Sequence, residues 1–348
     1  MRDEEYEQQI EGAIIRGDWT SVLEAGRTWA QTRLPSGRHN PRAYFALNFV
    51  HLIRGEFAEA WDTHAKALEA AEDIEQVRGW TDRMLAQYPE RANAHLVAGL
   101  FLAQSGHSEQ SVARYKEAIR LDPRAAYPHH FLAQIHDRAG RVEMAIKEYR
   151  EAVKLDPAYA PARTNLGVAY QEQGQIEMAI PQHREAIRLN PHDPVAHANL
   201  ACALAEQGKM EPALREYQEA IRLNPLDPDL HFALGGLYEE KNRQDLAMKE
   251  YQEALRVEPN FGAAETALGW MLVKKDRIYE AMECFNRALK ADPEDAKAYW
   301  GIARVYLGRG KQQSAMENYA RALKLLKDPA IKSQIMNELF REGNTWDA

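Results

Sequence analysis

The feature of this chain that most constrains its fold is a proline that recurs every 34 residues. Most of these prolines follow Asp, Asn or Glu in short phrases such as LDP, LNP and VEP. They are Pro89, Pro123, Pro157, Pro191, Pro225, Pro259 and Pro293. A regular period of this length is typical of an array of small structural units. The sequence therefore predicts one extended repeat array rather than the two globular domains that 348 residues would otherwise favour.

Other positions fall into columns when each proline is counted as position 32, so that repeats begin at residues 92, 126, 160, 194, 228, 262 and 296. Position 8 is always Gly or Ala, and position 27 is always Ala. Position 20 is nearly always Ala, and position 24 is Tyr or Phe except for His183. Small residues allow two helices to cross closely, and an aromatic ring fills the space beside them. Glycines at position 15 mark the turn between the helices. Each repeat is therefore predicted to be an antiparallel helix pair.

These columns resemble the pattern of the tetratricopeptide repeat (TPR) family, and the resemblance covers residues 92 to 329. It implies an all-α fold, a right-handed superhelical solenoid of antiparallel helix pairs with a concave and a convex surface. We expect irregular TPR-like helices in residues 1–91, seven consecutive 34-residue TPR units in 92–329, and a capping helix with a tail in 330–348.

The helix pairing before residue 92 has two interpretations. Residues 40–67 read as one pair that follows a loop at 32–41, with a degenerate pair before the loop. Alternatively, Trp61, Ala65 and Leu68 belong to the first helix of a pair whose second helix is 74–88.

Composition and charge exclude several classes of function. The formal net charge of -8 argues against binding nucleic acid. The acidic N-terminus and the lack of a long apolar run argue against secretion and membrane insertion, so we expect a cytoplasmic protein. The two cysteines, Cys202 and Cys284, imply neither a disulfide framework nor a zinc site. No metal or other cofactor is expected.

The sequence also lacks the motifs of common catalytic sites. It contains no HExxH, GxSxG, GxxxxGKT or GxGxxG, which favours a protein that is not an enzyme. His129, His130 and His136 lie close enough in sequence to suggest a metal. However, His129 shares position 4 with other histidines of the repeats, where the TPR family often has a bulky packing residue, so packing is the favoured interpretation.

In the TPR family, ligands contact positions 2, 5, 6, 9, 12 and 13 of the first helix of each pair, on the concave surface. Reading these positions here gives the predicted peptide-binding groove: Tyr127, His130, Gln134, Arg138, Asn165, Glu172, Asn199, Glu206, Phe232, Glu239, Glu240, Trp270, Lys274, Trp300 and Arg304. Trp270 and Trp300 are expected to be exposed anchors. The acids of the middle repeats predict a partner protein or peptide with basic and apolar residues.

Two subgroups of the family serve as references for these positions. The Lys and Asn clamp of chaperone-binding TPR proteins is absent from the regular repeats. Asn165 and Asn199 look like two rungs of the asparagine ladder in the O-GlcNAc transferase superhelix. The sequence thus favours a non-catalytic interaction scaffold or adaptor that binds a peptide or partner protein. The alternatives are a substrate-recognition subunit of a multi-chain enzyme such as a glycosyltransferase, and a scaffold that self-associates.

Overall fold

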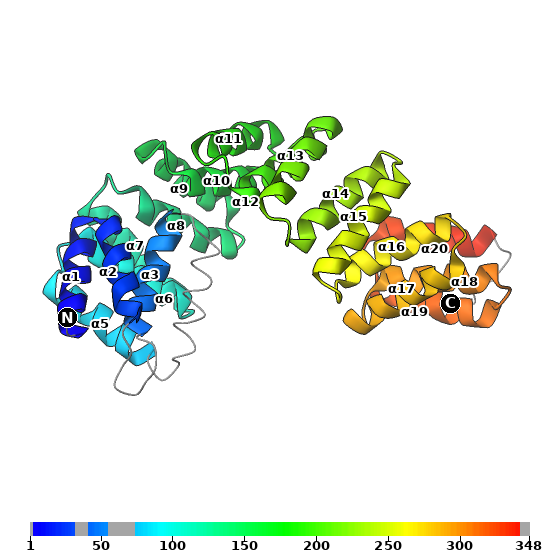
Figure 1. Cartoon of the computed structure of the whole chain (residues 1–348), viewed down its shortest axis with the longest axis horizontal. Coiled ribbons are helices and arrows are strands. Elements are labelled where there is room, and N and C mark those ends of the chain that lie inside the picture. Colours follow the sequence, from blue (N-terminus) through cyan, green and yellow to red (C-terminus); the bar gives the residue numbers. More distant parts are fainter. Residues whose placement is uncertain (1–2, 32–40, 55–73, 342–348) are drawn as a thin grey trace. The chain divides into compact units, whose positions relative to one another are not determined.

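A computed structural model describes residues 3–31, 41–54 and 74–341 of the chain (Figure 1). These residues form 19 α-helices and no strand, which confirms the all-α repeat fold. The chain divides into two compact units, Met1–His192 and Asp193–Ala348, and each unit is described by itself.

The first unit contains a group of irregular helices followed by three regular pairs. The irregular helices are α1 (Asp3–Arg16), α2 (Trp19–Gln31), α3 (Pro41–Arg54) and α5 (Ile74–Gln87). The regular pairs are α6 (Ala92–Gln104) with α7 (Ser108–Leu121), α8 (Ala126–Arg138) with α9 (Val142–Leu155), and α10 (Ala160–Glu172) with α11 (Ile176–Leu189).

The second unit contains four regular pairs and one further helix. The pairs are α12 (Pro194–Glu206) with α13 (Met210–Leu223), α14 (Pro228–Glu240) with α15 (Gln244–Val257), α16 (Gly262–Lys274) with α17 (Ile278–Ala291), and α18 (Ala296–Gly308) with α19 (Gln312–Leu325). The last helix is α20 (Pro329–Arg341), which buries Ile335 and Leu339.

The turn between the two helices of each pair requires a left-handed backbone at position 15. Five repeats place glycine there with φ between 67° and 80°. In the other two repeats Asn242 and Asp276 take the position with φ of 56° and 57°. Asn and Asp tolerate this conformation better than most residues, so the glycine can be replaced without changing the turn.

The small residue at position 8 packs directly against the side chain at position 24. A Cβ atom added to Gly235 would lie 2.6 Å from Tyr251, and one added to Gly167 would lie 2.4 Å from His183. His183 therefore occupies the space that a tyrosine or phenylalanine fills in the other repeats. It is fully buried, and its Nε2 lies 2.8 Å from the side-chain oxygen of Gln171. These contacts confirm the predicted register of the repeats.

The N-terminal helices of the first unit are joined by polar contacts as well as by apolar packing. Glu7 of α1 pairs with Arg42 of α3, and its other oxygen lies 2.6 Å from Arg83 of α5. Trp80 of α5 donates a hydrogen bond of 2.6 Å to the buried Glu11 of α1. Burial raises the pKa of Glu11, and the Trp80 hydrogen bond opposes that shift.

Helix α5 begins and ends 34 residues before α7, which is the register of a second helix. This favours the interpretation in which residues 74–88 complete a pair. Trp61, Ala65 and Leu68 lie outside the described residues, as do the second part of the 40–67 pair, residues 32–40 and the tail at 342–348. The degenerate pair before the loop is described: it consists of α1 and α2, joined by a turn in which Gly17 has a φ of 71°.

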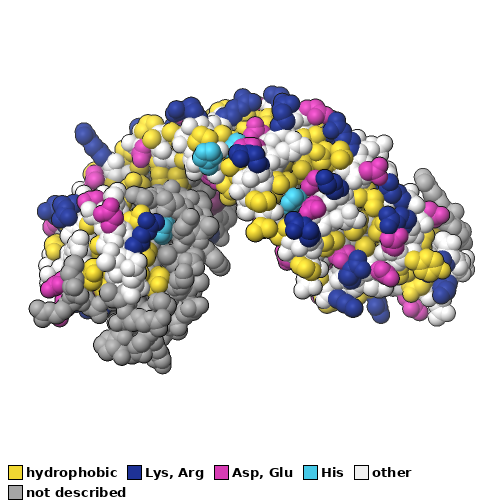
Figure 2. Space-filling model, viewed as in Figure 1, with side chains coloured by type: hydrophobic (Ala, Val, Ile, Leu, Met, Phe, Trp, Pro, Cys, Tyr) yellow, Lys and Arg dark blue, Asp and Glu magenta, His cyan; other side chains and the backbone are white. Residues whose placement is uncertain are grey.

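Charges of both signs are interspersed on the face of the molecule shown in Figure 2. The second helices contribute a recurring pair of an acid with a base three residues later, for example Glu117 with Arg120 and Glu219 with Arg222. Such exposed pairs contribute little to stability, typically about 0.3–0.5 kcal/mol each.

Candidate functional site

Position 5 of the first helices, one of the positions predicted to line the groove, is largely buried. His130 is 1% exposed, and its ring lies 5.0 Å from the ring of Tyr159 and 5.7 Å from that of Tyr149. Burial lowers the pKa of His130 to about 3, so the ring stays neutral. The expectation that His130 lines an open groove is therefore wrong, because its side chain points between helices.

Trp300, also at position 5, is 8% exposed, so the prediction that it is an exposed anchor is wrong as well. Its ring packs edge-on against Trp270 at 4.7 Å, and its Nε1 donates a 2.9 Å hydrogen bond to Glu338 of α20. The physical reason is that the helix after the last repeat stacks against α18 and covers this side chain.

Trp270, at position 9, is half-buried and held on three sides. Besides Trp300, it contacts the ring of Phe285 at 5.8 Å and the guanidinium of Arg304 at 5.5 Å. An aromatic ring that is fixed by its neighbours and still partly accessible loses little freedom when a ligand binds.

The other predicted residues keep part or all of their side chains accessible, and we call them the first-helix face. In the first unit it comprises Tyr127, Gln134, Arg138, Asn165 and Glu172. In the second unit it comprises Asn199, Glu206, Phe232, Glu239, Glu240, Trp270, Lys274 and Arg304. Thirteen of the fifteen predicted residues are thus at least partly accessible, five in the first unit and eight in the second.

The acids of the first-helix face are not equivalent. Glu239 accepts a hydrogen bond of 2.9 Å from Lys274 and one of 3.1 Å from the hydroxyl of Tyr251, so its charge is compensated within the protein. Glu172 has no ion pair in the described part of the chain. Its pKa is raised by partial burial and by the nearby carboxylate of Asp137.

The histidines at position 4 pair with glutamates, a contact that the sequence analysis missed. In three repeats the His Nδ1 lies 2.7–2.8 Å from a Glu oxygen at position 23 of the second helix. The pairs are His129–Glu148, His197–Glu216 and His231–Glu250. The recurring separation of 19 residues between His and Glu is the sequence signal that could have revealed them. Across the described ranges, no group of three His, Cys, Asp or Glu could hold a metal ion.

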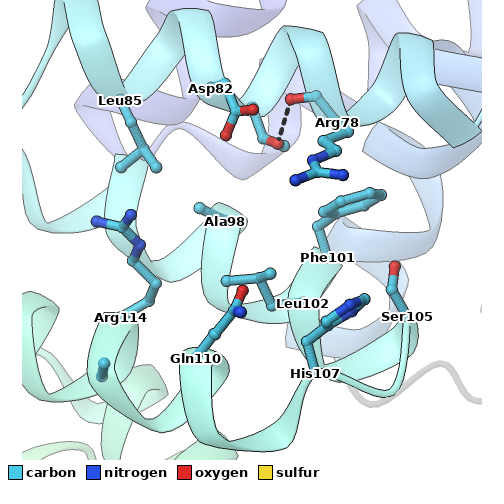
Figure 3. A pocket seen from close by; sticks show the side chains of 12 residues that line it. Arg78, Asp82, Leu85, Ala98, Phe101, Leu102, Ser105, His107, Gln110 and Arg114 are labelled. Carbon is cyan, nitrogen blue, oxygen red and sulfur yellow. Dashed lines mark hydrogen bonds between the residues drawn. The ribbon is translucent and has the colours of Figure 1, made fainter.

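A cavity of about 650 Å³ lies in the first unit between α5, α6 and α7 (Figure 3). Leu85, Phe101 and Leu102 form its apolar part, and Arg78 and Arg114 extend over it from α5 and α7. Its α6 residues occupy helix positions other than those of the first-helix face, so the cavity is a separate feature. The sequence analysis did not predict it, because part of its lining comes from the irregular α5.

Comparison with sequence families places most of the regular repeats in one class. Residues 137–174 and 202–242 match a TPR repeat model, and residues 160–193, 228–261 and 266–329 match tetratricopeptide repeat models. The chain belongs to the tetratricopeptide repeat family. No curated protein matches its sequence.

Two solved structures that align with a TM-score above 0.5 show the same fold. The Cut9–Hcn1 hetero-tetramer of the APC/C aligns over 93% of this chain and 66% of that chain, with 18% identity and a TM-score of 0.58. PilF of Pseudomonas aeruginosa aligns over 60% of this chain and 94% of that chain, with 21% identity and a TM-score of 0.53. MamA aligns over 48% of this chain and 97% of that chain, with 25% identity and a TM-score of 0.44.

Among the described helices, none is both long enough and apolar enough to cross a membrane.

Proposed function

We propose that this protein is a non-catalytic interaction scaffold whose first-helix face binds a peptide segment of a partner protein. TPR folds bind peptides and proteins, and the first helices form the ligand surface in the family that the sequence resembles. The class of function rests on the family. The place of binding rests on the accessible side chains described above.

The observation that carries the proposal is the state of Trp270. Its ring is fixed by Trp300, Phe285 and Arg304, yet it remains half-buried rather than buried. A preorganised, partly accessible tryptophan is the kind of side chain that dominates binding energy in protein interfaces. Arg304 beside it offers a donor for a carbonyl or carboxylate of the ligand.

The experiment uses peptides selected from a random display library on the immobilised full-length chain. Trp270→Ala should weaken binding of the selected peptides by at least about 2 kcal/mol, while the helical content stays unchanged. The matched control is Tyr279→Ala, since Tyr279 is an 80% exposed aromatic on the second helix α17 of the same repeat. Equal losses in both variants, or no loss in Trp270→Ala, would reject the first-helix face as the binding surface.

A further inference from the structure

Arg114 of α7 differs from the residues at the same repeat position in the next four repeats. In those repeats the side chain at position 23 is bonded to the side chain at position 4, over distances of 2.7–3.3 Å. In the repeat that begins at residue 92, position 23 is Arg114 and position 4 is His95. Nδ1 of His95 is buried without a hydrogen-bond partner, so the usual contact between these two positions is absent.

The guanidinium group of Arg114 forms no ion pair in the described part of the chain. Glu117, an acid on the same helix one turn away, is paired with Arg120 at 2.7 Å. The stem of Arg114 lies against α6, where a Cβ atom added to Gly99 would be 3.3 Å from the Cβ atom of Arg114. The far end of the side chain extends over the cavity between α5, α6 and α7 (Figure 3). The structure therefore directs an unpaired cation at this cavity.

The cavity has room for a small ligand and an apolar wall to hold it. Its volume of about 650 Å³ lies within the range of small-ligand sites, roughly 300–1,000 Å³. Leu85 of α5 and Phe101 and Leu102 of α6 form the apolar wall (Figure 3). An apolar wall beside an unpaired guanidinium suits a ligand that carries both an apolar group and an anionic group.

The charges around the cavity favour a monovalent anion. Arg78 and Arg114 are cationic, and Asp82 is the one acid among the described residues of the lining. These three side chains leave one formal positive charge in excess. A carboxylate neutralises this excess, whereas a phosphate dianion would add a second negative charge near Asp82. A guanidinium group also binds a carboxylate through two parallel hydrogen bonds, which fixes the orientation of the ligand.

We propose that this cavity binds an apolar carboxylate, and that Arg114 holds the carboxylate group. Leu85, Phe101 and Leu102 contact the apolar group of the ligand. A free carboxylic acid and the C-terminal residue of a peptide present this same chemistry, and the experiment below distinguishes them. The site is separate from the first-helix face, so it adds a second ligand site to the proposed function and does not depend on it.

The test titrates matched probes into the full-length chain and follows the backbone amide signals of Phe101, Leu102 and Gln110 by NMR. Hexanoate represents the free acid, and N-acetyl-glycyl-leucine represents the end of a peptide. Hexanamide and N-acetyl-glycyl-leucinamide are their uncharged counterparts. At least one of the two carboxylates should produce saturable shifts, and its amide should bind at least about tenfold more weakly. The carboxylate that binds identifies the source of the ligand.

Two variants test the role of Arg114. Arg114→Gln should remove the preference for the carboxylate, so that the carboxylate and its amide bind with equal affinity. Lys116→Gln is the matched control, since Lys116 is exposed on the same helix and its loss changes the net charge equally. This control should keep the preference.

Three outcomes would overturn the site: no saturable binding of either carboxylate, equal binding of carboxylate and amide to the unmodified protein, or an unchanged preference in Arg114→Gln. The outcome is separable from that of the proposed function. If selected peptides bind through Trp270 and neither carboxylate binds, the scaffold stands and this site falls. If a carboxylate binds through Arg114 and no peptide is captured, this site stands and the peptide scaffold falls.

Discussion

The two units carry different charges at equivalent repeat positions of their first helices, over cores that are built in the same way. In the first unit Asp137 and Glu172 repel each other, whereas in the second Glu239 and Lys274 form an ion pair. The helix packing inside the repeats is alike, since in both units a glycine at position 8 contacts an aromatic or imidazole ring at position 24. The difference teaches that the repeat fixes the core and leaves the face free to vary, which is how one repeated fold can hold different ligands.

The largest expected effect comes from disturbing the shared core. Gly167→Leu in the first unit and Gly235→Leu in the second should each lower the free energy of unfolding by about 1–3 kcal/mol or more, because a side chain is forced into His183 or Tyr251. Gly236→Leu is the matched control, since an added Cβ there meets no atom within 4 Å. Urea unfolding followed by circular dichroism measures the change. Similar stability of the Gly235 and Gly236 variants would contradict the assigned packing.

The core was predictable from sequence because it depends on residue size at fixed positions. The columns of small residues and rings identified the helix pairs, and even His183, the exception at position 24, fills the expected space. The turn glycines were also predictable, and Asn242 and Asp276 show which residues can replace them.

The first-helix face was less predictable, because the accessibility of its side chains depends on which neighbouring helices pack over them. His130 and Trp300 occupy a position that contacts ligands in related proteins, yet rings of neighbouring helices and α20 cover them here. The helices before residue 92 fit the columns poorly, so the repeat pattern did not predict the cavity beside α5.

A smaller effect on the free energy of unfolding is expected when a residue of one unit is given the charge found at the equivalent position of the other unit. Lys274→Glu should destabilise the protein by about 1 kcal/mol, because it removes an ion pair and places two acids together. Glu172→Lys should stabilise it by about 0.5 kcal/mol, since it creates the pair that the first unit lacks. Both shifts are read from urea midpoints at low salt. If both variants shift the urea midpoint in the same direction, the positions of Lys274 and Glu172 are not electrostatically equivalent.

The smallest expected effect is a pH dependence of stability that comes from Asp137 and Glu172. Asp137 and Glu172 have pKa values raised above their ordinary values of 3.8 and 4.5. The folded state therefore binds their protons more tightly than the unfolded state, and this contribution to stability is lost as the pH rises through the raised values. Arg138, Tyr149 and Asn165 are the other groups that face the pair.

Glu172→Gln removes one of the two charges and should be more stable than the unmodified protein at neutral pH, by about 0.3 kcal/mol. The difference should vanish at acid pH, where both carboxyls are protonated. Urea unfolding curves of both proteins, recorded from acid to neutral pH, provide the measurement. A difference in the free energy of unfolding that stays constant with pH would show that the two carboxylates do not interact.

The central claim is that partners bind to the first helices, and site-specific photo-crosslinking tests it most directly. A benzophenone amino acid is placed at Gln134 or Glu240 on the first-helix face, and at Met144 or Tyr279, which are exposed on second helices. Each variant is irradiated with a peptide selected on the full-length chain. The account predicts crosslinks from Gln134, Glu240 or both, and little from Met144 and Tyr279. Equal or stronger crosslinking from the second-helix positions would contradict it.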